Sequence, residues 1–264
     1  MSRLAKTFER LRAAQKTGLV TYVTAGDPDL PRSREVVLAI SEAGADVIEV
    51  GVPFSDPIAD GPAIQRASER ALAAGGHLSA TLDLVASVRA ELSAPIVLFT
   101  YVNPVFRLGV DAFVSRAAAA GVDGVLLLDL PIEESASMQQ TLDRQGIDEI
   151  FLVSPTTSDA RLRQAANLGR GFLYAISRLG VTGAREVVAA SAKPLVERIR
   201  RVSALPVALG FGLSRPEHVA EVGGFADAAV VGSALVDVIA KAAANGGDPA
   251  AAAGQFVRWL KGRE

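Results

Sequence analysis

Short apolar stretches alternate with longer amphipathic ones along the whole chain. The short stretches are rich in β-branched residues, whereas the longer ones are rich in alanine with apolar residues at helical spacing. The pattern predicts strands at Leu19–Thr24, Val47–Val50, Ile96–Thr100, Gly124–Leu128, Glu149–Val153, Phe172–Ala175, Val207–Leu209 and Ala228–Val231. It predicts helices between them, among others at Pro31–Ala43, Ala63–Ala73, Thr81–Glu91, Val110–Ala120, Glu133–Gln145 and Lys193–Arg201.

Eight such strand–helix units in 264 residues indicate an α/β fold, a closed (β/α)8 TIM barrel. We expect residues 1–264 to form one domain, with an extra N-terminal helix before Lys16 that covers the barrel floor. The competing fold is a doubly wound open sheet. The segment Val20–Pro28 lacks the GxGxxG turn of such dinucleotide-binding sheets, which favours the barrel.

Recurrent local signals mark the element boundaries. Gly44, Gly121 and Gly224 stand before predicted strands, and we expect each to cap the preceding helix. Ser214–Glu217 has the spacing of a capping box, which predicts a helix start after the seventh strand.

Composition narrows the classes of function. The chain has 27 Lys plus Arg against 29 Asp plus Glu, so its net charge of −2 gives no electrostatic footprint for nucleic acid. It contains no cysteine, which excludes disulfides and thiolate chemistry. No signal peptide or uncharged membrane span is visible, and we expect a cytoplasmic protein.

Two carboxylates stand where a barrel keeps its active site. Glu49 lies near the carboxyl end of the second strand, and Asp60 lies in the short loop that follows. Residues at strand carboxyl ends line the active-site face of this fold, so we expect acid–base chemistry here. The alternatives are a strand-end acid in an ion pair for Glu49 and a turn residue for Asp60.

Glycines at the last two strand ends suggest an anion site. Gly210-Phe211-Gly212 follows the seventh strand, and Gly232-Ser233 follows the eighth, immediately before an apolar helix. Barrels commonly bind phosphate through these loops, with backbone N–H groups as donors. Ordinary turns with Ser233 as an N-cap are the alternative. The loop Ser177–Arg185 could close over the site as a lid with Thr182 and Gly183, or be a plain surface loop.

The aromatic residues complete the predicted site. Strand alternation allows Tyr22, Phe99, Tyr101 and Tyr174 to face the lumen and form a flat apolar pocket, whereas Phe172 fits core packing. Both histidines, His77 and His218, lie in or beside helix starts as surface or capping residues, which argues against a histidine metal cage, and no metal is expected. All five lysines fall in predicted helical segments, which argues against a Schiff-base aldolase.

Several of these motifs together resemble the tryptophan synthase alpha subunits. They are the stretch from Glu49 to Gly61, the Gly-Phe-Gly-Leu-Ser after the seventh strand, the Ser-Arg-x-Gly-Val-Thr-Gly of the lid, Thr24-Ala-Gly-Asp-Pro and Thr100-Tyr-Val-Asn-Pro. The resemblance implies a carbon–carbon lyase that cleaves indole-3-glycerol phosphate to indole and glyceraldehyde 3-phosphate. It also implies a beta subunit partner in an alpha-beta-beta-alpha tetramer, with pyridoxal phosphate in that partner and no cofactor in this chain.

The resemblance also implies roles for single residues. Glu49 would be the acid–base shuttle, and Asp60 would accept the hydrogen bond of the indole N–H. Tyr22, Phe99, Leu126 and Tyr174 would enclose the indole ring, with Tyr101 nearby. The phosphate and lid residues would be Thr182, Gly183, Phe211, Gly212, Gly232 and Ser233. The residues facing the beta subunit would be Pro53, Asp56 and Asn103.

Thr21-Tyr22 and Leu128 depart from the usual family residues beside the indole pocket, which bears on ring fit and turnover rate. Three alternatives remain open. They are a lyase that works without a partner, a catalytically weak chain that activates the beta subunit, and a generic phosphate-binding barrel isomerase. Retention of both Glu49 and Asp60 argues against the activator, and two carboxylates combined with an aromatic slot argue against the isomerase.

Overall fold

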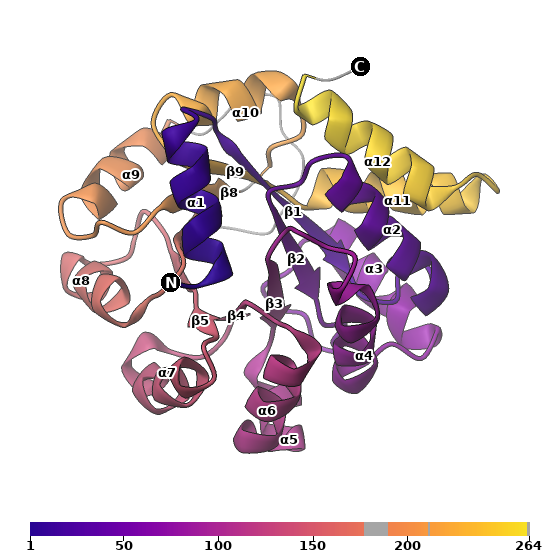
Figure 1. Ribbon diagram of the computed structural model, residues 1–264, viewed down its shortest axis with the longest axis horizontal. Coiled ribbons are helices and arrows are strands. Elements are labelled where there is room, and N and C mark those ends of the chain that lie inside the picture. Colours follow the sequence, from indigo (N-terminus) through magenta and orange to yellow (C-terminus); the bar gives the residue numbers. More distant parts are fainter. Residues whose placement is uncertain (177–189, 211, 263–264) are drawn as a thin grey trace.

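Nine short parallel strands form one sheet in the computed structural model, which describes residues 1–176, 190–210 and 212–262 (Figure 1). Their order is β5-β4-β3-β2-β1-β9-β8-β7-β6, so the last strand pairs with the first. The strands are β1 Gly18–Thr24, β2 Val47–Gly51, β3 Ile96–Thr100, β4 Gly124–Leu127, β5 Asp148–Glu149, β6 Phe151–Val153, β7 Leu173–Ile176, β8 Val207–Gly210 and β9 Ala228–Val231.

The predicted fifth strand closes the barrel as two pieces. β5 pairs with β4 and β6 pairs with β7, and only Ile150 separates the two pieces. The Ile150 N–H donates to the Val125 carbonyl at 2.9 Å, which continues the ladder across the break. The predicted TIM barrel is therefore confirmed, and the competing prediction of an open doubly wound sheet is wrong.

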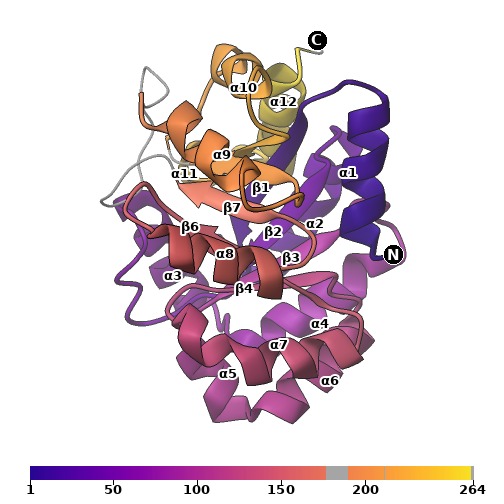
Figure 2. The ribbon, with the colours of Figure 1, turned by 90° about the vertical axis from the view of Figure 1, so that its left-hand side faces the viewer.

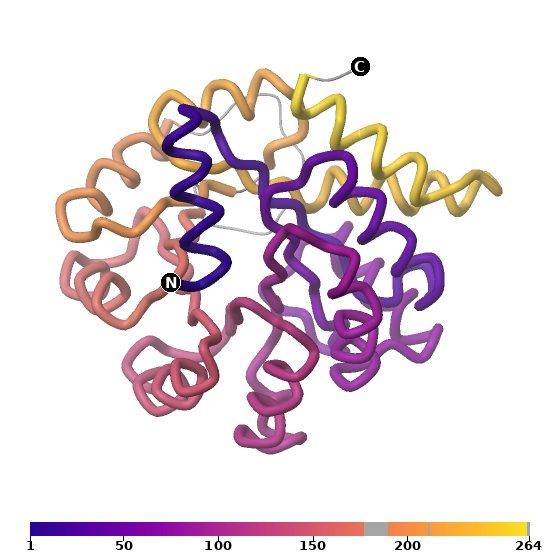
Figure 3. The backbone as a smooth tube through the Cα atoms, viewed as in Figure 1, coloured from indigo at the N-terminus to yellow at the C-terminus, as the bar shows by residue number. Residues whose placement is uncertain are grey.

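Helices surround the strands as an outer ring (Figures 1 and 3). No single helix of the described residues is long and apolar enough to cross a membrane, and only α3 with α4, bent by 91°, pass that test as a pair. The helices are α1 Arg3–Ala13, α2 Leu30–Glu42, α3 Pro62–Ala73, α4 Leu78–Arg89, α5 Val102–Leu108, α6 Val110–Ala120, η1 Ile132–Glu134, α7 Ser135–Arg144, α8 Asp159–Leu168, α9 Ala192–Arg200, α10 Pro216–Gly223, α11 Ser233–Ala244 and α12 Pro249–Leu260.

Helix α1 covers the amino end of the barrel, as predicted (Figure 2). Its Leu4, Phe8 and Leu11 belong to the apolar cluster that fills the lumen. The Phe8 and Phe172 rings lie 5.5 Å apart, which confirms Phe172 as a core residue. The floor of the barrel is thus closed by apolar side chains, and access to the lumen is left to the carboxyl end.

The structure differs from the local predictions at two places. Helix α10 is capped at Arg215 rather than Ser214, because a residue before proline prefers extended backbone and Pro216 occupies the first helical turn. Gly224 is the C-cap residue of α10, as predicted, with right-handed φ and ψ, whereas Gly44 and Gly121 have the positive φ typical of C-terminal glycines. Helix α5 was not predicted. Its Pro104 lies in the first turn, where a missing N–H is tolerated.

Candidate active site

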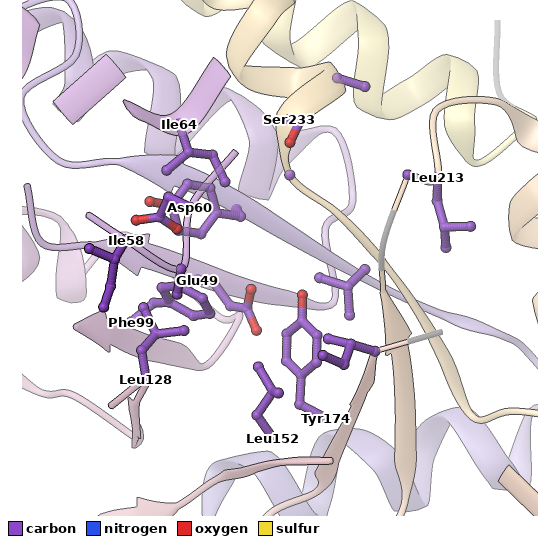
Figure 4. Close-up of a pocket in the computed structure, with 17 residues that line it drawn as sticks. Glu49, Ile58, Asp60, Ile64, Phe99, Leu128, Leu152, Tyr174, Leu213 and Ser233 are labelled. Carbon is purple, nitrogen blue, oxygen red and sulfur yellow. The ribbon is translucent and has the colours of Figure 1, made fainter. Parts of the chain in front are cut away.

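A cavity of about 380 Å³ opens at the carboxyl end of the barrel (Figure 4). It contains both predicted carboxylates, Glu49 and Asp60, together with Tyr22, Phe99 and Tyr174 of the predicted aromatic pocket. Loops that are distant in the sequence therefore meet at the place where barrel enzymes carry their chemistry.

Glu49 is the most deeply buried acid of the cavity. The strand alternation places it in the lumen, opposite Tyr22 of β1 in the register, with no solvent exposure. Neither of its carboxyl oxygens has a hydrogen-bond partner among the described residues. Burial raises the pKa of Glu49 to about 8, so the group is protonated at neutral pH. Figure 4 shows its carboxyl group and the Tyr174 hydroxyl extending into the same cavity.

Asp60 lies two residues before helix α3 and is 5% exposed. The Tyr101 hydroxyl donates to its Oδ2 at 3.1 Å. Burial raises the pKa of Asp60 to about 6, and the hydrogen bond from Tyr101 acts in the opposite direction. At neutral pH Asp60 is mainly charged while Glu49 is mainly neutral, so one cavity holds an acceptor and an acid.

Aromatic rings form one wall of the cavity. Tyr22 and Phe99 meet edge to face with centroids 5.3 Å apart. Two glycines make room for the tyrosines, since a Cβ on Gly51 would fall 2.1 Å from the Tyr22 hydroxyl oxygen and one on Gly210 would fall 2.7 Å from that of Tyr174. The result is a flat, mostly apolar slot that suits a planar aromatic ligand.

The predicted anion-binding residues lie at another part of the same cavity. Gly212, Gly232 and Ser233 line it, and Ser233 begins helix α11. A helix start offers free backbone N–H groups and a favourable dipole for an anion. Phe211, Thr182 and Gly183 lie outside the described residues.

Two predicted pocket residues lie elsewhere than expected. Leu126 is fully buried in the lumen cluster beneath the cavity. Leu128 lines the cavity instead, because it lies two residues closer to the carboxyl end on the same face. Tyr101 does not line the cavity. Its side chain lies behind Asp60 and bonds to it.

Sequence reasoning missed most of the aliphatic lining. Ile64 follows Asp60 by about one helical turn, and Leu152 follows Ile150 on the same strand face, so spacing could have found both. The other aliphatic residues missed are Ile58, Ala59, Ile176, Leu213, Val230 and Ala234. Leu152 and Ile58, 36% and 82% exposed, leave apolar surface at the cavity mouth.

The residues predicted to face a partner lie beside the site. Asp56 and Asn103 are exposed, and Pro53 lines a separate groove with Phe54, Pro104 and Arg107. No partner chain tests this interface, which stays a prediction.

The histidines have local roles. The Nδ1 of His77 accepts from the Ala80 N–H and caps α4, as predicted. His218 is not a surface residue. It is 4% exposed, and its Nδ1 accepts from the Ser214 N–H. The described part of the chain contains no group of three or more His, Cys, Asp or Glu that could hold a metal ion.

Comparisons with known proteins agree with this geometry. The family profile described as tryptophan synthase alpha chain matches residues 8–261. The tryptophan synthase alpha chain of Geotalea uraniireducens is 52% identical over 236 residues, 89% of this chain and 88% of that protein. Tryptophan synthase of Mycobacterium tuberculosis superposes with a TM-score of 0.91 at 39% identity, covering 99% of this chain and 97% of that one. Tryptophan synthase subunit alpha from Legionella pneumophila gives 0.90 at 37% identity, covering 99% and 98%.

Proposed function

This chain belongs to the tryptophan synthase alpha chain family, a family of lyases, and we propose that it cleaves indole-3-glycerol phosphate to indole and glyceraldehyde 3-phosphate. The observation that carries the proposal is the pair Glu49 and Asp60, held in one aromatic-walled cavity with different protonation at neutral pH. A generic phosphate-binding isomerase needs no aromatic slot between its two acids.

The proposed reaction is a retro-aldol cleavage that moves one proton onto the indole and one off the side chain. Protonated Glu49 gives its proton to C3 of the indole, and the resulting carboxylate accepts the proton of the adjacent side-chain hydroxyl. The hydroxyl carbon becomes the aldehyde as the C3–carbon bond breaks, and the bonding electrons return to the indole ring. Glu49 ends protonated, so the cycle balances, and its raised pKa suits the first step.

Asp60 supports this step by accepting the hydrogen bond of the indole N–H. Protonation of C3 puts positive charge on the ring nitrogen, and a nearby carboxylate in a cavity of low dielectric stabilises that charge. Tyr22, Phe99, Leu128 and Tyr174 would enclose the ring. Leu126 would contribute only from the layer beneath.

The phosphate would bind at the Gly212, Gly232 and Ser233 end of the cavity, through backbone N–H groups and the serine hydroxyl. Family resemblance adds Phe211, Thr182 and Gly183 to this proposal, as phosphate and lid residues.

We infer that the partner is a beta subunit and that the two form an alpha-beta-beta-alpha tetramer. Pro53, Asp56 and Asn103 are the proposed contact residues. Pro53 and Asp56 lie on the loop after β2, and Asn103 lies in the first turn of helix α5. Any pyridoxal phosphate would belong to that partner, and no step of the proposed cleavage needs a cofactor in this chain.

The test is indole release from indole-3-glycerol phosphate by the purified chain, with and without a cognate beta subunit. Weak activity alone that rises strongly with the partner supports the proposal in full. High activity that ignores the partner supports a lyase that works alone. No indole in either condition would overturn the catalytic proposal and leave the role of a beta-subunit activator.

A further inference from the structure

The loop that carries Asp60 is open to solvent on most of its length, yet the Asp60 side chain is buried. Ser55, Asp56, Ile58 and Ala59 are exposed, whereas Asp60 is 5% exposed. Backbone turns alone, such as the Asp60 N–H to the Pro57 carbonyl at 3.0 Å, fix the chain direction but leave the carboxylate rotamer open. Something else must aim this side chain.

Tyr101 contacts the loop at two successive residues. Its hydroxyl oxygen accepts from the Ala59 N–H at 3.0 Å, and its proton goes to Asp60 Oδ2 at 3.1 Å. The direction of the second bond is fixed, because the Ala59 N–H can only donate and the Asp60 carboxylate can only accept. Among the described residues no other side chain bonds to the Asp60 carboxylate, and Oδ1 accepts no hydrogen bond.

The tyrosine itself is rigidly held. It is 3% exposed at the end of β3, and its ring packs on Phe54 with centroids 5.0 Å apart. A hydroxyl on a fixed ring holds one oxygen of Asp60 on the side away from the cavity and leaves the other for a ligand.

We propose that Tyr101 is a positioning residue, which holds Asp60 charged and oriented so that Oδ1 can accept the indole N–H. The inference rests on the proposed function for the role of Asp60, and on the contacts alone for the hydrogen bond. It assigns to Tyr101 a role outside the indole pocket.

The neighbouring tyrosine offers a matched control. Tyr22 is also buried and lines the cavity, but its hydroxyl lies 3.4 Å from Thr24 Oγ1 and makes no hydrogen bond to Asp60. Tyr22→Phe and Tyr101→Phe each remove one buried hydroxyl and keep the ring. Only the second removes a donor to Asp60.

The experiment follows the Asp60 carboxyl by 13C NMR in protein labelled at the aspartate side chain, with the resonance assigned by Asp60→Asn. Tyr101→Phe should move the titration midpoint of Asp60 upward by about one pH unit, because a charge-assisted hydrogen bond to the ionised form is lost. The acid limb of kcat should move by the same amount, with kcat at neutral pH changing more than KM. Tyr22→Phe should leave the Asp60 midpoint in place.

An unchanged Asp60 midpoint in Tyr101→Phe would overturn the inference, as would equal shifts in the two variants. Tyr101→Phe should add less than about a twofold loss of kcat in the Asp60→Asn background, because it acts through Asp60. Absence of indole release by the wild-type chain would sink the proposed function, while the NMR midpoint would still decide the role of the tyrosine. A thermal melt on each variant separates these effects from unfolding.

Discussion

Glu49 and Glu149 are two buried glutamates on strands of the same barrel, but only Glu49 lines the cavity. Both are at most 2% exposed, both have a carboxyl oxygen with no partner among the described residues, and burial raises the pKa of each to about 8. Glu49 faces the lumen and lines the cavity. Glu149 lies in β5, which packs against helix α7, and a hydrogen bond from Ser135 of that helix acts to lower its pKa against the effect of burial.

A shifted pKa therefore identifies a buried acid, whether or not that acid is catalytic. Structural burial perturbs carboxylates as strongly as an active site does. What distinguishes Glu49 is access to a cavity that a substrate can enter, with Tyr174 and a second acid facing the same space. We therefore expect substitutions at the two glutamates to separate turnover from stability.

The largest expected effect is on turnover in Glu49→Gln. The amide keeps the shape but cannot shuttle a proton, so kcat for indole release should fall by about 10²–10⁴-fold or more. Steady-state assays with indole-3-glycerol phosphate measure this, and Glu149→Gln is the matched control with the same change of atoms. Near-normal indole release by Glu49→Gln would refute the assignment and remove the contrast between the two sites.

Asp60→Asn should lower kcat by about 10²–10³-fold while substrate still binds, because the amide can bond to the ring but carries no charge to stabilise the protonated indole. Binding is followed by equilibrium titration with substrate under conditions of slow turnover. Unchanged turnover would mean that another group bears the indole charge.

Part of this contrast could be read from the sequence. A carboxylate in an apolar strand followed by a short Pro/Gly loop with a second acid was enough to find Glu49 and Asp60. The strand period of two also indicated the lumen-facing tyrosines Tyr22 and Tyr174.

The remaining features of the site depend on tertiary contacts, which the spacing of residue types along the sequence does not reveal. Asp148-Glu149-Ile150 has the same acid-in-a-strand pattern as β2, and the face taken by Glu149 depends on the break at Ile150 and the pairing with β4. Leu126 lies one layer of side chains deeper in the barrel than predicted, because its depth depends on where the lumen cluster ends. Tyr101 has a lumen-compatible position in sequence, and only the fold of the Asp60 loop places its hydroxyl on Asp60.

The pH profile of kcat/KM should separate the acids further. Asp60 must be charged and Glu49 protonated in the free chain, so activity should fall about tenfold per pH unit below about pH 6 and above about pH 8. Glu149 titrates in the same range as Glu49, yet Glu149→Gln should keep both limbs, because this carboxyl does not reach the cavity. Loss of the alkaline limb in Glu149→Gln would mean that ionisation of Glu149 affects the reaction.

The smallest effect on turnover, within about twofold, is expected for Glu149→Gln, which should instead change stability. The folded pKa of Glu149 lies above its value of 4.5 in an unfolded chain. Its contribution is therefore fully present below about pH 4.5 and is lost as pH rises toward about 8. Glutamine cannot ionise, so at about pH 9 the variant should gain on the order of 5 kcal/mol in the free energy of unfolding, and less than about 1 kcal/mol at about pH 5. Urea unfolding at the two pH values measures the gain. An equal gain at both would mean that packing rather than ionisation sets the cost of this buried acid, and the two glutamates would then differ in chemistry as well as in location.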